Sequence, residues 1–226
     1  MAFGLPTAGG GDILPYIKYN AKAGRVIRVD RTQGVNGWES EEVDITDNFS
    51  AVIDLENIQV GWVYYGPQGP QREMATYKKE PTPAMPSDVN EEGKAVYKSG
   101  FLVKMALTKA SGGGIREFGS NAGCVVEAMG GLYDAFEVAP EAQQGKVPIV
   151  TMQGVTADKG DYGTNYRPNF AITGWVDRPE GLVVGATVIT PDPKPAAATS
   201  PATGSTQASP PPQDAAMAEA SEGDFG

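Results

Sequence analysis

The sequence predicts a mainly β protein: a five-stranded barrel with one helix, followed by a disordered C-terminal tail. Apolar and polar residues alternate with a period of two through most of residues 13–183, which is typical of antiparallel strands. One stretch, residues 122–136, has helical spacing instead. After Thr190 the composition changes to Pro, Ala, Ser, Thr, Gly and Gln, which cannot form a core. We therefore expect a flexible N-terminal arm (1–12), a folded domain (13–190) and a disordered linker with an acidic tip (191–226).

Five segments have the pattern of strands: residues 25–31, 49–65, 101–108, 148–155 and 169–176. In the third, Lys104 lies opposite an apolar face formed by Phe101, Val103, Met105 and Leu107. The second is long, and we expect it to bend at Asn57. Between the second and third strands, residues 66–98 are rich in Pro and charge, so we expect a long loop there.

The single helix is expected to follow the glycine turn at residues 112–114, with Ser120 or Asn121 as its N-cap. Its apolar positions bury one stripe: Ala122, Val125, Val126, Met129, Leu132, Tyr133 and Phe136. The order of elements is three strands, a helix and two strands. This is the order of the OB-fold, a Greek-key barrel whose helix lies between strands 3 and 4 and whose strands 2 and 3 bind oligonucleotides.

The amino-acid composition excludes several classes of enzyme. The chain of 226 residues has no histidine, which excludes Ser-His-Asp and Cys-His catalysis and HExxH zinc sites. We therefore expect a binding protein without a cofactor, not an enzyme. The single cysteine, Cys124, cannot form an intramolecular disulfide, which favours a cytoplasmic location. No apolar run is long enough to span a membrane, so we expect no membrane partner.

Basic and aromatic residues repeatedly stand side by side in this sequence, in the expected strands and in the long loop. A surface for single-stranded nucleic acid needs cations to contact phosphates and exposed rings on which bases stack. Since a core aromatic has no need of a charged neighbour, we predict that these residues form a DNA-binding surface on one wall of the barrel. They are Lys18, Tyr19, Lys22, Arg25, Arg28, Trp62, Tyr64, Tyr65, Tyr77, Lys78, Lys79, Tyr97, Lys98, Lys104, Tyr166 and Arg167.

Carboxylates gather in another segment and could form a two-metal nuclease site. They are Glu39, Glu41, Glu42, Asp44, Asp47, Asp54 and Glu56. No second carboxylate motif completes such a site, and acids beside a hairpin are usually solvated. The glycines at 112–114 are no phosphate loop, because Ile115-Arg116-Glu117 follows them instead of Gly-Lys-Ser/Thr.

The C-terminus carries acids and a lone aromatic on a long linker. Glu219, Glu222, Asp224 and Phe225 could dock on a partner protein, with the linker setting the effective concentration. The composition is equally consistent with a tail that only increases the solubility of the protein.

The expected strand order, the basic and aromatic pairs, the neutral linker and the ending SEGDFG resemble bacteriophage and bacterial single-stranded DNA-binding proteins. Gly226 follows Phe225, so the aromatic is not terminal as it is in that family. The resemblance implies an OB-fold, sequence-nonspecific binding of single-stranded DNA and the option of a homodimer. It also implies recruitment of replication or repair proteins through the tail, in the host cytoplasm if a phage encodes the chain.

The sequence is therefore consistent with three functions. The first is single-stranded DNA binding in phage replication or recombination. The second is a structural or assembly role in a phage particle without nucleic-acid binding, for which an acidic β domain is equally suited. The third is a metal-dependent nuclease.

Overall fold

A computed structural model describes residues 15–34, 37–67, 69–160 and 163–182. The chain divides into two units, Met1–Asp192 and Pro193–Gly226, and all described residues belong to the first. The expected N-terminal arm (1–12), the linker and the tail residues Glu219, Glu222, Asp224 and Phe225 lie outside the described residues.

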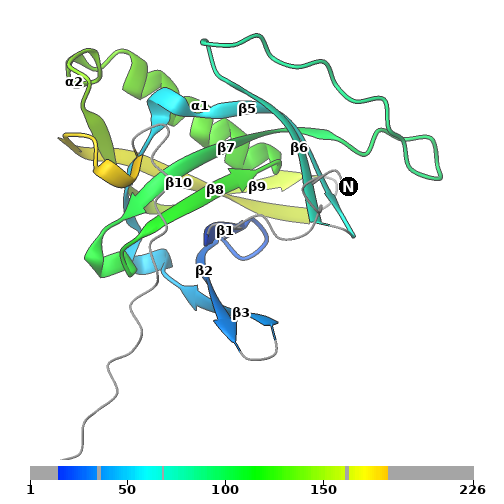
Figure 1. Cartoon of the computed structure of the whole chain (residues 1–226), viewed down its shortest axis with the longest axis horizontal. Coiled ribbons are helices and arrows are strands. Elements are labelled where there is room, and N and C mark those ends of the chain that lie inside the picture. Colours follow the sequence, from blue (N-terminus) through cyan, green and yellow to red (C-terminus); the bar gives the residue numbers. More distant parts are fainter. Residues whose placement is uncertain (1–14, 35–36, 68, 161–162, 183–226) are drawn as a thin grey trace, which may run out of the picture. The chain divides into compact units, whose positions relative to one another are not determined.

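The described residues form ten strands in one sheet, which confirms a mainly β fold (Figure 1). The strands are β1 Tyr16–Asn20, β2 Arg25–Gly34, β3 Gly37–Asp44, β4 Ser50–Ile53, β5 Gln59–Gly66, β6 Gly69–Thr76, β7 Lys98–Leu107, β8 Ile115–Ser120, β9 Val147–Gly160 and β10 Gly163–Val176. Their order is β10-β9-β4-β7-β8-β1-β2-β3, with β5 also paired to β7 and β6 paired to β5. The expected five-stranded closed barrel is wrong, because the sheet has twice that number of strands and does not close.

The sequence did not predict four of the strands, because each of them lacks a clear apolar face. β3 is mostly acidic, and β6 lies within residues 66–98, where we expected only loop. β1 is short, and β8 buries a charged residue, Arg116. The expected bend in residues 49–65 is confirmed, since the 3-10 turn Leu55–Asn57 separates β4 from β5.

The one long helix, α1 Gly123–Glu137, is confirmed, and it packs against β10 (Figure 1). Its N-cap is Ala122 and not Ser120 or Asn121, although the Ser120 hydroxyl accepts a hydrogen bond of 3.2 Å from the Ala122 N–H. The buried stripe consists of Val125, Met129, Leu132 and Phe136. A short helix, α2 Pro140–Gln143, and three further 3-10 turns complete the described elements: Thr46–Asn48, Lys109–Ser111 and Glu180–Leu182.

The core lies between α1 and one face of the sheet, which we call the inner face. Four phenylalanine rings form a row in it, with centroid distances of 5.2 to 6.3 Å, from Phe101 through Phe118 and Phe170 to Phe49. The predicted apolar face of β7 is confirmed, because Phe101, Val103, Met105 and Leu107 are all buried here. Alternation then places Lys98, Leu102 and Lys104 on the opposite, outer face of the same strand.

A turn near the end of the described chain covers part of the outer face. Leu182 is buried, and Gly181 lies so close to Ile115 of β8 that a Cβ atom at Gly181 would be 2.7 Å from that side chain. Arg178 anchors this turn by ion pairs with the carboxylates of Asp54 and Glu56. Lys98 and Lys104, on the outer face of β7, remain exposed.

Candidate nucleic-acid interface and an apolar pocket

The outer face of β1, β2 and β5–β8 gathers five cations and two tyrosines, which we call the basic face: Lys18, Arg31, Arg72, Lys98, Lys104, Tyr16 and Tyr65. Strand register places them on one side. In the strand register, Tyr16 lies opposite both Val29 and Glu117. Lys104 also lies opposite Glu117, and both Lys98 and Arg72 lie opposite Val63. Directly opposed residues in neighbouring strands share a face of the sheet.

The β5–β6 hairpin curls over the basic face. Arg72 of β6 forms an ion pair of 3.2 Å with Glu117 of β8, although β5 and β7 lie between these strands in the sheet. Neighbouring strands are about 4.8 Å apart, so a flat sheet would separate these two residues by roughly 14 Å across the strands and by roughly 20 Å along them. The contact shows that the sheet bends toward this face, which brings Tyr65 next to Tyr16.

The two tyrosines have different roles on this face. Tyr65 is exposed, with 52% of its surface accessible, and partial burial of its hydroxyl raises the pKa of the phenol. Tyr16 is half-buried, and the guanidinium carbon of Arg31 lies 5.6 Å from the centre of its ring. Nε of Arg31 is buried without a hydrogen-bond partner among the described residues. Tyr65 can therefore offer a ring face to a ligand, whereas the ring of Tyr16 already has a guanidinium beside it.

The cations of the basic face differ in how far they are neutralised. Lys18 is 3.4 Å from Glu42, with both side chains about half exposed, and Arg72 is paired with Glu117. Lys98 and Lys104 form no ion pair among the described residues, although Glu117, which pairs with Arg72, lies opposite Lys104 in the strand register. In a chain with 28 acids and 18 bases, these two exposed lysines leave positive charge on this face, although they stand roughly 20 Å apart along β7.

The other predicted cations lie elsewhere and are neutralised. Tyr166 and Arg167 of β10 lie beside the β1–β2 turn, where the Tyr166 N–H donates to Ala21 O and the Tyr19 hydroxyl donates to Tyr166 O. Burial is the main cause that raises the pKa of Tyr19 to about 12. Arg167 pairs with Glu127 and Asp158. This group therefore holds two ends of the sheet together, and Lys22, in the same turn, also has an interaction partner.

Arg25 and Arg28 also have structural partners. Arg25 pairs with Asp44 at 3.0 Å, and a hydrogen bond from Thr46 is the main cause that lowers the pKa of the Asp44 carboxyl. Arg28 donates to Asp30 at 2.8 Å and to the Ser111 carbonyl at 3.1 Å. Its guanidinium passes over Gly112, whose φ of 100° favours glycine and where a Cβ atom would overlap the side chain.

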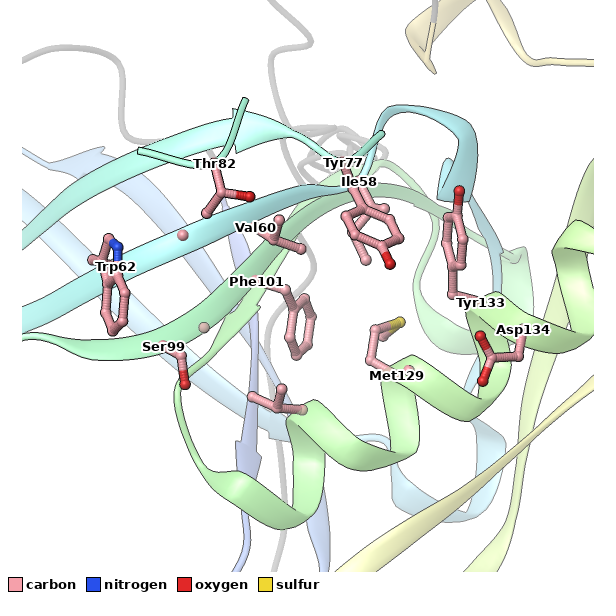
Figure 2. Close-up of a pocket in the computed structure, with 14 residues that line it drawn as sticks. Ile58, Val60, Trp62, Tyr77, Thr82, Ser99, Phe101, Met129, Tyr133 and Asp134 are labelled. Carbon is pink, nitrogen blue, oxygen red and sulfur yellow. The ribbon is translucent and has the colours of Figure 1, made fainter. Parts of the chain in front are cut away.

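An apolar pocket of about 290 Å³ lies on the inner side of the same strands, between β5, β7, α1 and residues 77–82 (Figure 2). The rings of Trp62, Tyr77, Phe101 and Tyr133 surround it, and Met129 lies at its base. The indole N–H of Trp62 donates to Pro83 O at 2.9 Å, which ties β5 to the β6–β7 connection. The pocket is open to a ligand, but its walls offer few polar groups.

Lys78 and Tyr77, both predicted to contact DNA, lie at this pocket and not on the basic face. The ammonium of Lys78 lies 5.5 Å from the Tyr77 ring centre and 5.4 Å from that of Tyr133. It also pairs with Glu137, and this hydrogen bond raises the pKa of Lys78. Lys79 is likewise neutralised, by Glu56 at 3.1 Å.

The prediction that the ring of Tyr97 is exposed is wrong. Only 8% of its surface is accessible, because its ring packs against Tyr64 at 5.7 Å and its hydroxyl donates to Gln71 at 2.8 Å. Tyr97 and the half-buried Tyr64 therefore join β5, β6 and the start of β7. Neither ring offers an open face for stacking in this arrangement.

The structure brings together four of the predicted DNA-binding residues, Lys18, Tyr65, Lys98 and Lys104. The expectation that all of them converge on one wall is wrong, since the others divide between the β1–β2 turn, the core and the pocket. Sequence reasoning missed Tyr16, Arg31 and Arg72 on the basic face. The alternation in residues 16–20 could have revealed Tyr16, but no local signal shows that Arg72 folds back toward β8.

Two further properties of the described residues bear on function. Among them, no three Asp, Glu or Cys side chains lie close enough together to hold a metal ion. No helix within the described ranges has the length and apolar character needed to cross a bilayer.

Comparison of the chain with models of known families, with curated proteins and with solved structures finds no match in any of the three.

Proposed function

We propose that this protein binds single-stranded DNA through the basic face, without sequence specificity. The observation that carries the proposal is that Lys98 and Lys104, both exposed and without an ion pair among the described residues, share one bent face with the exposed Tyr65. Lysines without carboxylate partners attract phosphates, and an exposed ring gives a base a surface to stack on.

The aromatic component favours a single strand over a duplex. Bases in a duplex are already stacked on each other, so Tyr65 can pair its ring face only with an unpaired base. Contacts of this kind do not distinguish one base from another, because every base has a π-face. The side chains of Lys98 and Lys104 would contact the backbone, which is the same for every sequence.

A titration of fluorescein-labelled oligo-dT, followed by anisotropy at several salt concentrations, tests the proposal. We expect the Lys98→Gln/Lys104→Gln double variant to bind about tenfold more weakly at low salt. The slope of log affinity against log salt should fall by about 1.4, since each lost phosphate contact on a single strand contributes ~0.7. A competing duplex of the same length should displace the oligonucleotide poorly.

The matched control is Lys94→Gln, because Lys94 is 75% exposed in the β6–β7 connection and pairs with Glu92. Its affinity and salt slope should equal those of the wild type. Absence of oligo-dT binding by the wild-type chain at low salt would contradict the proposal and favour a structural or assembly role. Equal losses in the double variant and the control would show that binding depends on total charge and not on this face.

A further inference from the structure

The apolar pocket is a surface that DNA binding leaves unused. It lies on the inner side of β5 and β7, because Val60, Trp62 and Phe101 line it, whereas the neighbouring Val63, Lys98 and Lys104 point to the outer side. The same strands therefore present two different surfaces, one basic and one apolar, and a ligand on one does not block the other.

Two glycines on α1 are not required by packing among the described residues. Gly130 and Gly131 lie in the middle of the helix, where glycine is less favourable than alanine. A Cβ atom at either position would meet nothing within 4 Å. Close packing against the described part of the chain therefore does not explain them. Gly130 lines the pocket, and a larger side chain there would project into space that is now open.

A carboxylate at the rim of the pocket indicates what kind of ligand would bind there. Asp134 lies at the edge of the pocket (Figure 2) and has no cationic partner among the described residues. The other acids of α1 are neutralised, Glu127 by Arg167 and Glu137 by Lys78. A ligand with an apolar group and an adjacent positive charge would bury the first against the rings and place the second near Asp134.

The size of the pocket indicates that its occupant is a side chain of a peptide. A volume of about 290 Å³ lies just below the ~300–1,000 Å³ found for small-molecule and cofactor sites. It is suited to one large side chain and part of its neighbour. Buried aromatic anchors of this kind supply much of the affinity in protein interfaces.

We propose that this pocket docks a short segment of a partner protein in which a large apolar side chain stands next to a lysine or arginine. The apolar side chain packs among Trp62, Tyr77, Phe101 and Tyr133, and the cation pairs with Asp134. The open surface at Gly130 lets the backbone of the segment approach α1 closely. This inference does not depend on DNA binding.

Amide chemical shifts of the ¹⁵N-labelled full chain test the inference, with three synthetic peptides as probes at millimolar concentration. The peptides are Gly-Gly-Phe-Lys-Gly-Gly and its versions with Gln or Glu in place of Lys. We expect shift changes clustered around the pocket, with the Lys peptide binding at least threefold more tightly than the Gln peptide and the Glu peptide weakest. The Asp134→Asn variant should remove the difference between Lys and Gln.

Gly130→Leu and Gly131→Leu form a matched pair, since both positions are open but only Gly130 lines the pocket. We expect Gly130→Leu to weaken the Lys peptide at least tenfold and Gly131→Leu to leave it unchanged, while both variants keep wild-type oligo-dT affinity and raise the melting temperature by a similar amount. Scattered shift changes, or equal binding of the Lys and Glu peptides, would overturn the inference. So would self-association of the chain that sedimentation detects and Gly130→Leu abolishes, because a second copy would then be the occupant.

Discussion

Lys104 and Arg116 lie on neighbouring strands, one register position apart, but on opposite faces of the sheet. Arg116 is 4% exposed on the inner face, where it donates to Asp30 at 2.8 Å. Lys104 is exposed on the outer face and has no acid partner among the described residues. One cation therefore belongs to the fold, whereas the other is available to a ligand. The carboxylates around each residue, and not its sequence neighbours, distinguish the two roles.

The largest effect is expected where the structural cation loses its charge partner. Asp30 accepts hydrogen bonds from both Arg28 and Arg116, and its side chain is only 16% exposed. We expect Asp30→Asn to reduce the free energy of unfolding by about 3 kcal/mol, because breaking a buried ion pair leaves a charge uncompensated. Urea denaturation measures this change. Lys104→Gln should alter stability by less than ~0.5 kcal/mol; equal losses in both variants would remove the distinction between the two environments.

A smaller effect should separate the exposed ring of the basic face from the rings of the pocket. We expect Tyr65→Ala to weaken oligo-dT binding by about 1 kcal/mol, roughly fivefold, because one stacking surface is lost. Tyr77→Ala should have no effect on this affinity, although Tyr77 is 38% exposed, because its ring lies at the pocket. Anisotropy titrations of both variants make the comparison. A larger loss in Tyr77→Ala would place the DNA on the other side of the sheet.

The smallest effect concerns pH. Hydrogen bonding from Lys79 is the main cause that lowers the pKa of Glu56 below its ordinary value of 4.5, and Arg178 adds to it. A lowered folded-state pKa stabilises the protein above pH 4.5 and loses this effect as the pH falls through the folded value. We expect Glu56→Gln to be less stable than wild type at pH 6 and the gap to narrow below pH 4.5. Thermal unfolding across this range measures it; a constant gap would show that the charge of Glu56 does not matter.

The sequence predicted those parts of the fold that have a regular apolar pattern. The helix stripe from Val125 to Phe136, the buried face of β7 and the bend at Asn57 all follow from local spacing. β3 and β6 carry mostly polar side chains, so pairing with a neighbouring strand defines them and apolar periodicity does not.

The candidate site was harder to predict, because a basic residue next to an aromatic one looks the same whether or not a carboxylate faces it. Glu127 and Asp158 reach Arg167 from distant parts of the chain, and Glu137 reaches Lys78 across 59 residues. Such partners depend on the tertiary fold. Only Lys98 and Lys104 kept both the predicted exposure and freedom from acid partners within the described ranges.

The ion pair between Arg72 and Glu117 has a consequence for how any DNA contact would be measured. A phosphate that reaches Arg72 must exchange places with a carboxylate of the protein itself, whereas one that reaches Lys98, which lies opposite Val63, releases only mobile counterions. Only the second kind of exchange contributes to the dependence of affinity on ionic strength. A count of contacts from that dependence would therefore fall short of the number of side chains touching the backbone, and Glu117 would act as a built-in counterion.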